Sequence, residues 1–330
     1  MRRNRIRLAG NFAVFHRFAK FVAACTGMLI LAGSLVTSHE AGLSVPDWPT
    51  TYGWNMFTFP PSMWVGNIFY EHGHRLVASA VGLLTIVMVL WLWIAEPRRW
   101  LRWLGVVALG AVIAQGLLGA VTVLYFLPPA ISTAHAGLAE IFFCVTVATA
   151  LFTSPGWNAL PSTPVDDARL RGLTTATTIS IYAQILVGAT MRHTGAGLAI
   201  PDFPLMFGGL WPDHWTAAIG IHFAHRVGAL FAAGMALCSS VYIWRRHMDR
   251  PELASPALLV LVFMVIQIAL GAVTVLSGRQ PLTTSLHVVG GALVLATSLV
   301  ITLRSWQIRI ADRVPRPFEP PQDRPKYVEA

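Results

Sequence analysis

The sequence predicts an all-α polytopic membrane protein with eight transmembrane helices, arranged as two tandem parallel-repeat four-helix bundles. Three observations carry this prediction. Of the 330 residues, 55% are hydrophobic and 12% are charged, whereas a soluble domain carries about 25% charged residues. Apolar runs long enough to cross a bilayer recur along the whole chain. The motifs of the first half also return in the second half, four apolar runs later.

Eight apolar runs, each about 20 residues or longer, account for the predicted spans. They lie near residues 16–36, 67–94, 104–125, 131–153, 173–191, 215–244, 255–276 and 283–303. The first run follows a basic N-terminus but continues to Thr37 without a small-residue cleavage site. We therefore expect an uncleaved first span rather than a signal peptide.

The basic residues predict the orientation of these spans. With the N-terminus inside, the cytoplasmic segments hold 20 of the 24 Lys and Arg residues, and the outer segments hold only Arg192 and Arg279. Cytoplasmic loops of membrane proteins carry this excess of positive charge. We therefore expect both termini in the cytoplasm. The net charge of +9 is a topology signal, and no nucleic-acid partner is expected.

An internal repeat divides the chain. The matched segments are 40–49 with 195–204, 73–82 with 224–234, 114–124 with 266–276, and 132–140 with 284–292. Because each copy has an even number of spans, both copies cross the membrane in the same sense, as parallel repeats do. The expected domains are a first four-helix bundle (1–153), a cytoplasmic linker (154–172), a second four-helix bundle (173–310) and a disordered cytoplasmic tail (311–330).

The repeat selects four of the eleven histidines. His74 matches His225, at the start of the second and sixth spans, and His135 matches His287, at the start of the fourth and eighth. These four spans run from outside to inside, so the four side chains lie at similar depth. Two facing imidazoles on neighbouring helices of an apolar bundle are an arrangement that ligates haem iron. The pattern predicts one such pair of iron ligands in each half.

Two other roles for these histidines remain open. A lone intramembrane histidine is commonly a hydrogen-bond partner between helices. Zinc is disfavoured because no cysteine, aspartate or further histidine joins each pair at ligand spacing, although Glu71 leaves zinc open for the first half.

The two halves differ beside these histidines. Glu71 lies three residues before His74, so both side chains share one helix face, and the counterpart of Glu71 is His222. A carboxylate over a porphyrin edge can accept a proton or stabilise developing positive charge. We therefore expect the first half to perform chemistry and the second half to hold a permanent redox cofactor. An ion pair between Glu71 and Arg75 is the alternative.

Two arginines and two aspartates complete the candidate sites. Arg75 and Arg226 each directly follow a predicted iron ligand. Each could donate two hydrogen bonds to a haem propionate or extend to the membrane interface. Asp47 and Asp202 lie in the repeated outer loops, flanked by prolines and aromatic residues, and are expected to order turns there.

Together these motifs resemble the haem A synthase family. The resemblance rests on the E-x-x-H-R text at 71–75, the AGL…PDWP outer loop and the later histidines in a duplicated four-helix unit, and it covers residues 16–303. It implies an integral-membrane oxidoreductase that oxidises a methyl group of haem O to a formyl group by successive hydroxylations, which gives haem A for terminal oxidases. It also implies roles for the matching residues: Glu71 as the catalytic carboxylate, His74 and His135 as contacts to the substrate haem, and His225 and His287 as ligands of a haem b.

The resemblance also sets expectations about partners and location. Haem O and haem A are the expected substrate and product, with haem O synthase and oxidase assembly factors as candidate partners, in the lipid of a bacterial inner membrane. The electron donor is expected to be another molecule, because the chain shows no cysteine cluster for an iron–sulfur centre and no G-x-G-x-x-G motif. Many family members carry a cysteine pair in the outer loops, and this chain has none there.

Two further functions compete with this one. A di-haem b-type cytochrome that moves electrons between a quinol and a partner would use the same four histidines, but it gives Glu71 no special task. A parallel-repeat transporter would use the histidines as a proton relay and bind no haem.

Overall fold

The computed structural model describes the backbone of residues 2–158 and 166–312 and the side chains of residues 13–157 and 166–310. Within these ranges the chain is helical and has no β-strand, as the sequence predicts. The long helices are α1 (Arg2–Ser38), α2 (Asn67–Ala95), α3 (Arg99–Leu124), α4 (Pro129–Phe152), α6 (Ala168–His193), α7 (Ala217–Arg246), α8 (Pro251–Leu276) and α9 (Pro281–Ser305). The short helices are η1 (Met56–Thr58), η2 (Pro61–Met63), α5 (Pro155–Asn158), η3 (Ala196–Leu198) and α10 (Gln307–Asp312). Most of the predicted tail and the centre of the predicted linker lie outside the described residues.

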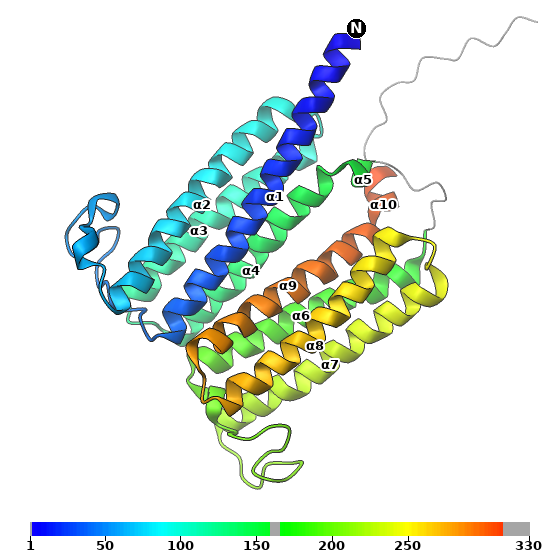
Figure 1. Ribbon diagram of the computed structural model, residues 1–330. Coiled ribbons are helices and arrows are strands. Elements are labelled where there is room, and N and C mark those ends of the chain that lie inside the picture. Colours follow the sequence, from blue (N-terminus) through cyan, green and yellow to red (C-terminus); the bar gives the residue numbers. More distant parts are fainter. Residues whose placement is uncertain (1, 159–165, 313–330) are drawn as a thin grey trace, which may run out of the picture.

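The long helices form two groups that lie side by side (Figure 1). In the first group α1 and α3 each contact both α2 and α4, and in the second group α6 and α8 each contact both α7 and α9. The groups meet where α4 contacts α6 and α9, and where α1 contacts α9. Segments 39–66 and 194–216 protrude at one end of the molecule, which we call the loop end (Figure 1).

Within the described residues, seven helices are long and apolar enough to cross a membrane, as in an integral membrane protein. The predicted span 173–191 lies in α6, which is not one of the seven. This helix carries several threonines, and their hydroxyls bond to neighbouring helices: Thr177 to Ser239 at 2.6 Å and Thr178 to Ser298 at 2.7 Å. Such hydrogen bonds satisfy polar side chains between packed helices, so the low hydropathy of α6 reflects its contacts with α7 and α9.

Local sequence explains where several helices begin. Three of the long helices start at a proline (Pro129, Pro251 and Pro281), a residue favoured at the first helical position because its φ is already helical and its missing N–H is not needed. Asp167 and Thr216 cap α6 and α7, because their side chains accept hydrogen bonds from backbone N–H groups of the first turn.

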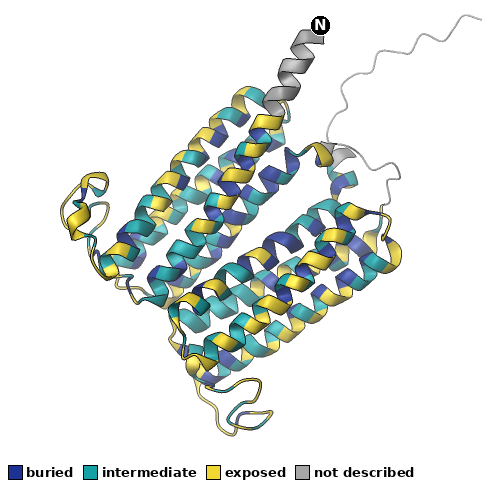
Figure 2. Cartoon of the chain, in the orientation of Figure 1, coloured by how far each residue is buried: buried dark blue, intermediate teal, exposed yellow. Residues whose placement is uncertain are grey.

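Burial differs strongly among the helices (Figure 2). Half of the most apolar segment of α4 and of α9 is buried, against 11% for α3 and α8. The helices α4 and α9 therefore form the centre of the molecule, since each contacts both groups. A helix that is apolar on its exposed faces is typical of a membrane span, which accounts for the exposed leucines, isoleucines and valines of α3 and α8.

A half-buried arginine joins the two groups near the loop end. Arg192 of α6 donates hydrogen bonds to the backbone oxygen of Ser34 at 2.9 Å and to the hydroxyl of Ser38 at 2.8 Å, both on α1. Ser38 in turn lies 2.9 Å from the hydroxyl of Ser285 on α9. These contacts connect three helices from the two groups.

Candidate functional site

The four predicted iron ligands lie at similar depth on four different helices. His135 and His287 each follow the first residue of their helix by six positions. His74 follows the start of α2 by seven positions, and His225 follows the start of α7 by eight. At 1.5 Å per residue, the four side chains lie about 9–12 Å from the loop end. The structure therefore brings the predicted histidines to one level of the molecule.

In the second group, each imidazole packs against a glycine of the preceding long helix. A Cβ atom placed on Gly188 of α6 would lie 2.8 Å from Cε1 of His225. A Cβ atom on Gly271 of α8 would lie 2.9 Å from Cε1 of His287. Both separations are well below ordinary van der Waals contact of about 3.5–4.0 Å, so only glycine leaves room for these rings.

The first group repeats this contact less tightly. A Cβ atom on Gly33 of α1 would lie 3.0 Å from Cε1 of His74, and one on Gly119 of α3 would lie 3.4 Å from Cε1 of His135. Each of the four histidines therefore has a glycine seat, which we define as the glycine of the preceding helix that its ring contacts.

The rings of the second pair are close and nearly perpendicular. The centroids of His225 and His287 lie 6.3 Å apart with an interplanar angle of 77°. The amide nitrogen of Gln184 lies 2.9 Å from Nδ1 of His225, and the backbone oxygen of Gln267 lies 3.1 Å from Nδ1 of His287. Nδ1 of His287 donates its hydrogen to that backbone oxygen, so Nε2 of His287 keeps a lone pair for a metal ion. Nδ1 of His225 faces an amide donor, so this ring offers Nε2 to a metal only when the Gln184 amide turns its oxygen towards Nδ1.

The first pair shares only part of this pattern. Nδ1 of His74 is buried and has no hydrogen-bond partner in the described part of the chain, whereas His135 faces the backbone of Gln115 as His287 faces that of Gln267. Buried polar atoms are nearly always satisfied, and each exception calls for an explanation such as a bound group.

The second pair suits a haem better than zinc. Two imidazoles that bind one metal ion from opposite sides, at about 2 Å per bond, have ring centres about 6 Å apart, and the second pair has this separation. Among the described residues, no group of three or more His, Cys, Asp or Glu side chains is placed to hold a metal ion. An iron that brings four porphyrin nitrogens needs only two protein ligands, so the residues present fit a haem.

Glu71 and Arg75 dock the first outer loop onto α2. Glu71 is 3% exposed, and its carboxylate accepts hydrogen bonds from the Val45 N–H at 2.8 Å and from Arg75 at 2.7 Å. The same guanidinium donates to three loop carbonyls, those of Val45, Asp47 and Thr50, at 2.8, 2.7 and 3.1 Å. The ion pair that the sequence offers as the alternative role of Glu71 is thus present. The Arg75 guanidinium lies on the loop, and its contact with a propionate stays a prediction.

The second outer loop docks in the same way, with an imidazole in place of the carboxylate. Nδ1 of His222 accepts a hydrogen bond from the Ile200 N–H at 3.2 Å. Arg226 donates to three loop carbonyls, those of Ile200, Asp202 and Leu205, at 3.1, 2.6 and 2.9 Å. In this loop contact the two halves therefore differ by one side chain, Glu71 against His222, and here too a propionate contact of Arg226 stays a prediction.

The two loop aspartates order turns, as predicted. The Asp47 carboxylate accepts hydrogen bonds from the N–H groups of Tyr52 and Gly53 at 2.8 and 2.9 Å, and Asp202 accepts two equivalent bonds. Partial burial acts to raise the pKa of Asp47, but these bonds outweigh it, so the pKa lies below its ordinary value. The bond from Gly208 likewise lowers the pKa of Asp202. Both carboxylates are therefore ionised at neutral pH.

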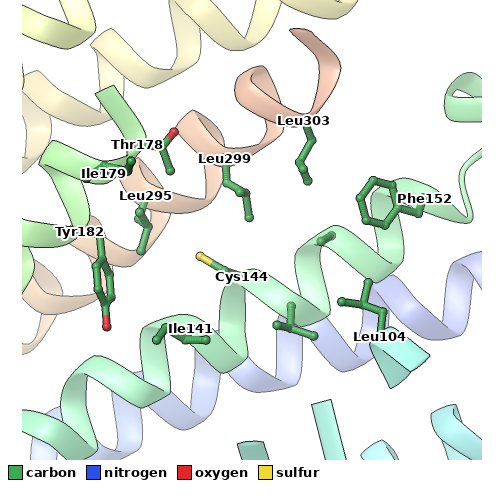
Figure 3. A pocket seen from close by; sticks show the side chains of 12 residues that line it. Leu104, Ile141, Cys144, Phe152, Thr178, Ile179, Tyr182, Leu295, Leu299 and Leu303 are labelled. Carbon is green, nitrogen blue, oxygen red and sulfur yellow. The ribbon is translucent and has the colours of Figure 1, made fainter. Parts of the chain in front are cut away.

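An apolar cavity of about 420 Å³ lies between the two groups (Figure 3). Side chains of α3, α4, α6 and α9 line it, among them Ile141, Cys144, Tyr182 and Leu295. None of the predicted site residues lines this cavity. The candidate chemistry therefore lies with the histidine pairs, nearer the loop end.

The glycine seats are not among the predicted site residues. Gly33 and Gly188 are 155 positions apart, and Gly119 and Gly271 are 152 apart. These are the offsets of the internal repeat, so the same self-comparison contains a signal for the glycines. Their contact with the histidines depends on how neighbouring helices pack, which the repeat alone does not give.

Comparison with known proteins identifies the family to which the chain belongs. The family model COX15-CtaA, described as cytochrome oxidase assembly protein, matches residues 16–299. A protein named heme A synthase from Shouchella clausii is 30% identical over 289 residues, which cover 87% of this chain and 93% of that protein. Heme A synthase from Symbiobacterium thermophilum is 33% identical over 281 residues, covering 80% and 87%. Because the family model spans most of the sequence and the relatives match over most of their lengths, the chain belongs to the COX15-CtaA family of cytochrome oxidase assembly proteins.

Proposed function

We propose that this protein is a haem A synthase, an oxidoreductase that converts a methyl group of haem O to a formyl group by successive hydroxylations. The main observation behind this proposal is that each half holds a pair of histidines packed on glycines. Only the first pair has a buried carboxylate beside it, that of Glu71. Membership of a cytochrome oxidase assembly family and the names of the relatives support this proposal. Haem A made here would go to terminal oxidases.

The second group is the cofactor half of the proposed enzyme. His225 and His287 would hold a haem b through Nε2, with the ring hydrogen on Nδ1. His287 already directs Nδ1 at the backbone oxygen of Gln267, and His225 would donate to the side-chain oxygen of Gln184 once that amide turns. This haem would supply electrons from an external donor. The residues around it position the two rings and exclude water.

The first group is the substrate half. His74 and His135 would bind the iron of haem O, and the unpartnered Nδ1 of His74 leaves that ring free to adjust as substrate enters and product leaves. Glu71 shares a helix face with His74 and is held by Arg75 and the Val45 N–H. Its carboxylate would accept a proton or stabilise positive charge that develops near the reacting methyl group.

The contact of the first outer loop with α2 supports the assignment of the first group as the substrate half. Arg75 and Glu71 fix the backbone of Val45 beside the start of α2, so the loop end of the substrate half is closed by protein. Closing a site removes water and strengthens the electrostatic contacts within it. The loop would therefore act as a cover over the substrate.

The proposed setting is a bacterial inner membrane. All eight long helices would span it as two parallel four-helix repeats, with the boundaries 1–153 and 173–310 and with both termini in the cytoplasm. The loop end then faces outward, and the basic residues cluster inside as positive-inside topology requires. Haem O synthase as the source of substrate and oxidase assembly factors as recipients of product are the proposed partners.

Glu71→Gln tests the proposed reaction. The amide still accepts a hydrogen bond from the Val45 N–H but cannot take a proton or offer negative charge. We expect haem binding to persist and conversion of haem O to haem A to fall by about 10²–10⁴-fold, the usual contribution of a general acid or base. Haem composition after expression in cells that make haem O measures both quantities.

Glu71→His provides the matched control, because His222 already fills this position in the second half. An imidazole at this site keeps the backbone contact that His222 makes with Ile200, so the loop stays docked while the carboxylate is gone. Loss of conversion in both variants, with haem retained, supports catalysis by Glu71. Wild-type conversion in either variant would contradict it and leave a di-haem electron-transfer cytochrome as the better account.

A further inference from the structure

Two glutamines contact the histidines of the second group. The amide nitrogen of Gln184 lies 2.9 Å from Nδ1 and 2.7 Å from the backbone oxygen of His225. Gln267 contacts His287 twice: its backbone oxygen lies 3.1 Å from Nδ1, and its amide nitrogen lies 3.5 Å from Nε2. Each glutamine therefore makes two contacts with its histidine.

Each glutamine amide also lies directly on a glycine. A Cβ atom at Gly228 would lie 2.2 Å from Oε1 of Gln184, and one at Gly290 would lie 2.3 Å from Oε1 of Gln267. These glycines follow His225 and His287 by three positions, so each shares a helix face with its histidine. A side chain at either glycine would therefore displace the glutamine amide from its present position.

The first group lacks this arrangement. At the repeat offsets, Leu29 stands in place of Gln184, and Val77 and Leu138 stand in place of the two glycines. Gln115 matches Gln267, but it has no glycine opposite it at the matching position. The paired glutamine and glycine are thus a property of one half and not of the repeat in general.

We propose that Gln184 and Gln267, seated on Gly228 and Gly290, are positioning residues that fix the two imidazole planes of the second site. The nearly perpendicular rings, 77° apart, are held in place before a haem binds. A site prearranged in this way retains its haem, because ligand orientation is already set. The first site, which has Leu29 in place of Gln184 and no glycine opposite Gln115, releases its haem as product. This inference rests on the proposed function, which places a resident haem b in the second half.

Gln184→Leu tests the inference by copying Leu29 of the first half. We expect the variant to lose haem b to an excess of apomyoglobin about 10-fold faster, the lower end of the usual effect of removing a contact to a metal ligand. We also expect a changed low-spin ferric EPR signal, because the anisotropy of that signal follows the angle between the two axial imidazole planes. A side chain that only fills space would not set that angle.

A double variant repeats this test with the space refilled, and a variant of the first half serves as its control. Gln184→Leu combined with Gly228→Val reproduces the first-half pair and refills the space over residue 228, and it should show the same EPR change and the same faster loss. Gln115→Leu makes the equivalent change in the first half and should leave the haem b signal and its loss rate at the wild-type values.

The outcomes are distinct. Wild-type haem b loss and an unchanged EPR signal in both Gln184 variants would overturn the inference while leaving the proposed function intact. A wild-type protein that carries no haem b would overturn the proposed function and this inference with it. Faster loss and a changed signal in both Gln184 variants, with Gln115→Leu unchanged, would support it.

Discussion

At the scale of single residues, the two halves use the same positions and differ in what surrounds them. His74 and His225 each sit on a glycine of the preceding helix. Only His225 has a side chain against Nδ1, and only His74 has a carboxylate three residues before it. These two differences match a bound cofactor in one half and a reacting substrate in the other.

Gly188→Ala tests the glycine seats. The added methyl group would lie 2.8 Å from Cε1 of His225, so the ring must move from its position opposite His287. We expect haem b content per protein to fall by at least half, measured by the pyridine haemochrome spectrum of the purified protein.

Gly234→Ala is the matched control on α7. Nothing lies within 4 Å of a Cβ atom at this glycine, and alanine stabilises a helix interior by about 0.5–1 kcal/mol relative to glycine. Haem b content should stay at the wild-type value there. Equal haem b content in the Gly188 and Gly234 variants would contradict the role of the seat.

Sequence reasoning reaches some of these residues and not others. The offset of the repeat selects the four histidines, and helical spacing places Glu71 beside both His74 and Arg75. The contacts of Gln184 and Gly188 depend on the packing of α6 against α7. Spacing within one helix carries no information about such packing, so these residues appear only in three dimensions.

At the scale of elements, α6 shows why mean hydropathy can miss a transmembrane candidate whose polar side chains are paired with neighbouring helices. The apolar run predicts a span over 173–191, whereas the helix covers Ala168–His193. Its threonines bond to α7 and α9, as Thr177 does to Ser239, so their hydroxyls are satisfied by protein. Mean hydropathy is an average over side chains that ignores such hydrogen-bond partners. Alone among the eight long helices in the described part of the chain, α6 therefore falls outside the group that is apolar enough to cross a membrane.

Asp167 is expected to stabilise the start of α6. Its carboxylate accepts hydrogen bonds from the N–H groups of Arg169 and Leu170 at 2.9 and 3.0 Å, and it lies 2.9 Å from the Tyr242 hydroxyl and 3.0 Å from Nε2 of His247. Asp167→Ala should lower the free energy of unfolding by about 1–2 kcal/mol, as loss of a helix cap does. Thermal unfolding in detergent at pH 7 measures the change, and Asp167→Asn, which can still cap, should lose less.

The stabilising effect of Asp167 should also depend on pH. Burial acts to raise the pKa of this carboxyl, but hydrogen bonds from Leu170, His247, Tyr242 and Arg169 outweigh it and lower the pKa to about 2 from its ordinary value of 3.8. Because the pKa is lower in the folded state, the contribution is complete above pH 3.8 and is lost as the pH falls towards about 2. The difference in unfolding temperature between wild type and Asp167→Ala should shrink as the pH falls below 3.8. A difference that stayed unchanged down to about pH 2 would argue against this account.

At the scale of the whole molecule, the two candidate haem sites adjoin. His135 lies on α4 and His287 on α9, each six positions from the start of its helix, and these two helices contact each other where the groups meet. Electrons from a haem in the second half would therefore have a short path to a substrate in the first. The sequence predicts two groups of four helices from the repeat, but which helices meet between the groups depends on packing that the repeat does not specify.

The contact between the groups should survive a break in the chain. A protease site placed within 159–165 allows cleavage of the purified protein between the groups. Because Arg192 bonds to Ser34 and Ser38, and α9 packs on α1 and α4, we expect the two fragments to co-elute in mild detergent with haem b retained. Separation of the fragments after cleavage would show that the linker, and not the helix contacts, joins the halves.

The haem content of the purified protein tests the proposed function most directly. The protein would be purified in mild detergent from cells that make haem O, its reduced-minus-oxidised spectrum recorded, and its haems extracted and separated by reversed-phase chromatography. We expect haem b together with haem O or haem A, which places cofactor and substrate in one molecule. Haem b alone would support a di-haem electron-transfer cytochrome instead, and a protein without haem would contradict the assignment of all four histidines.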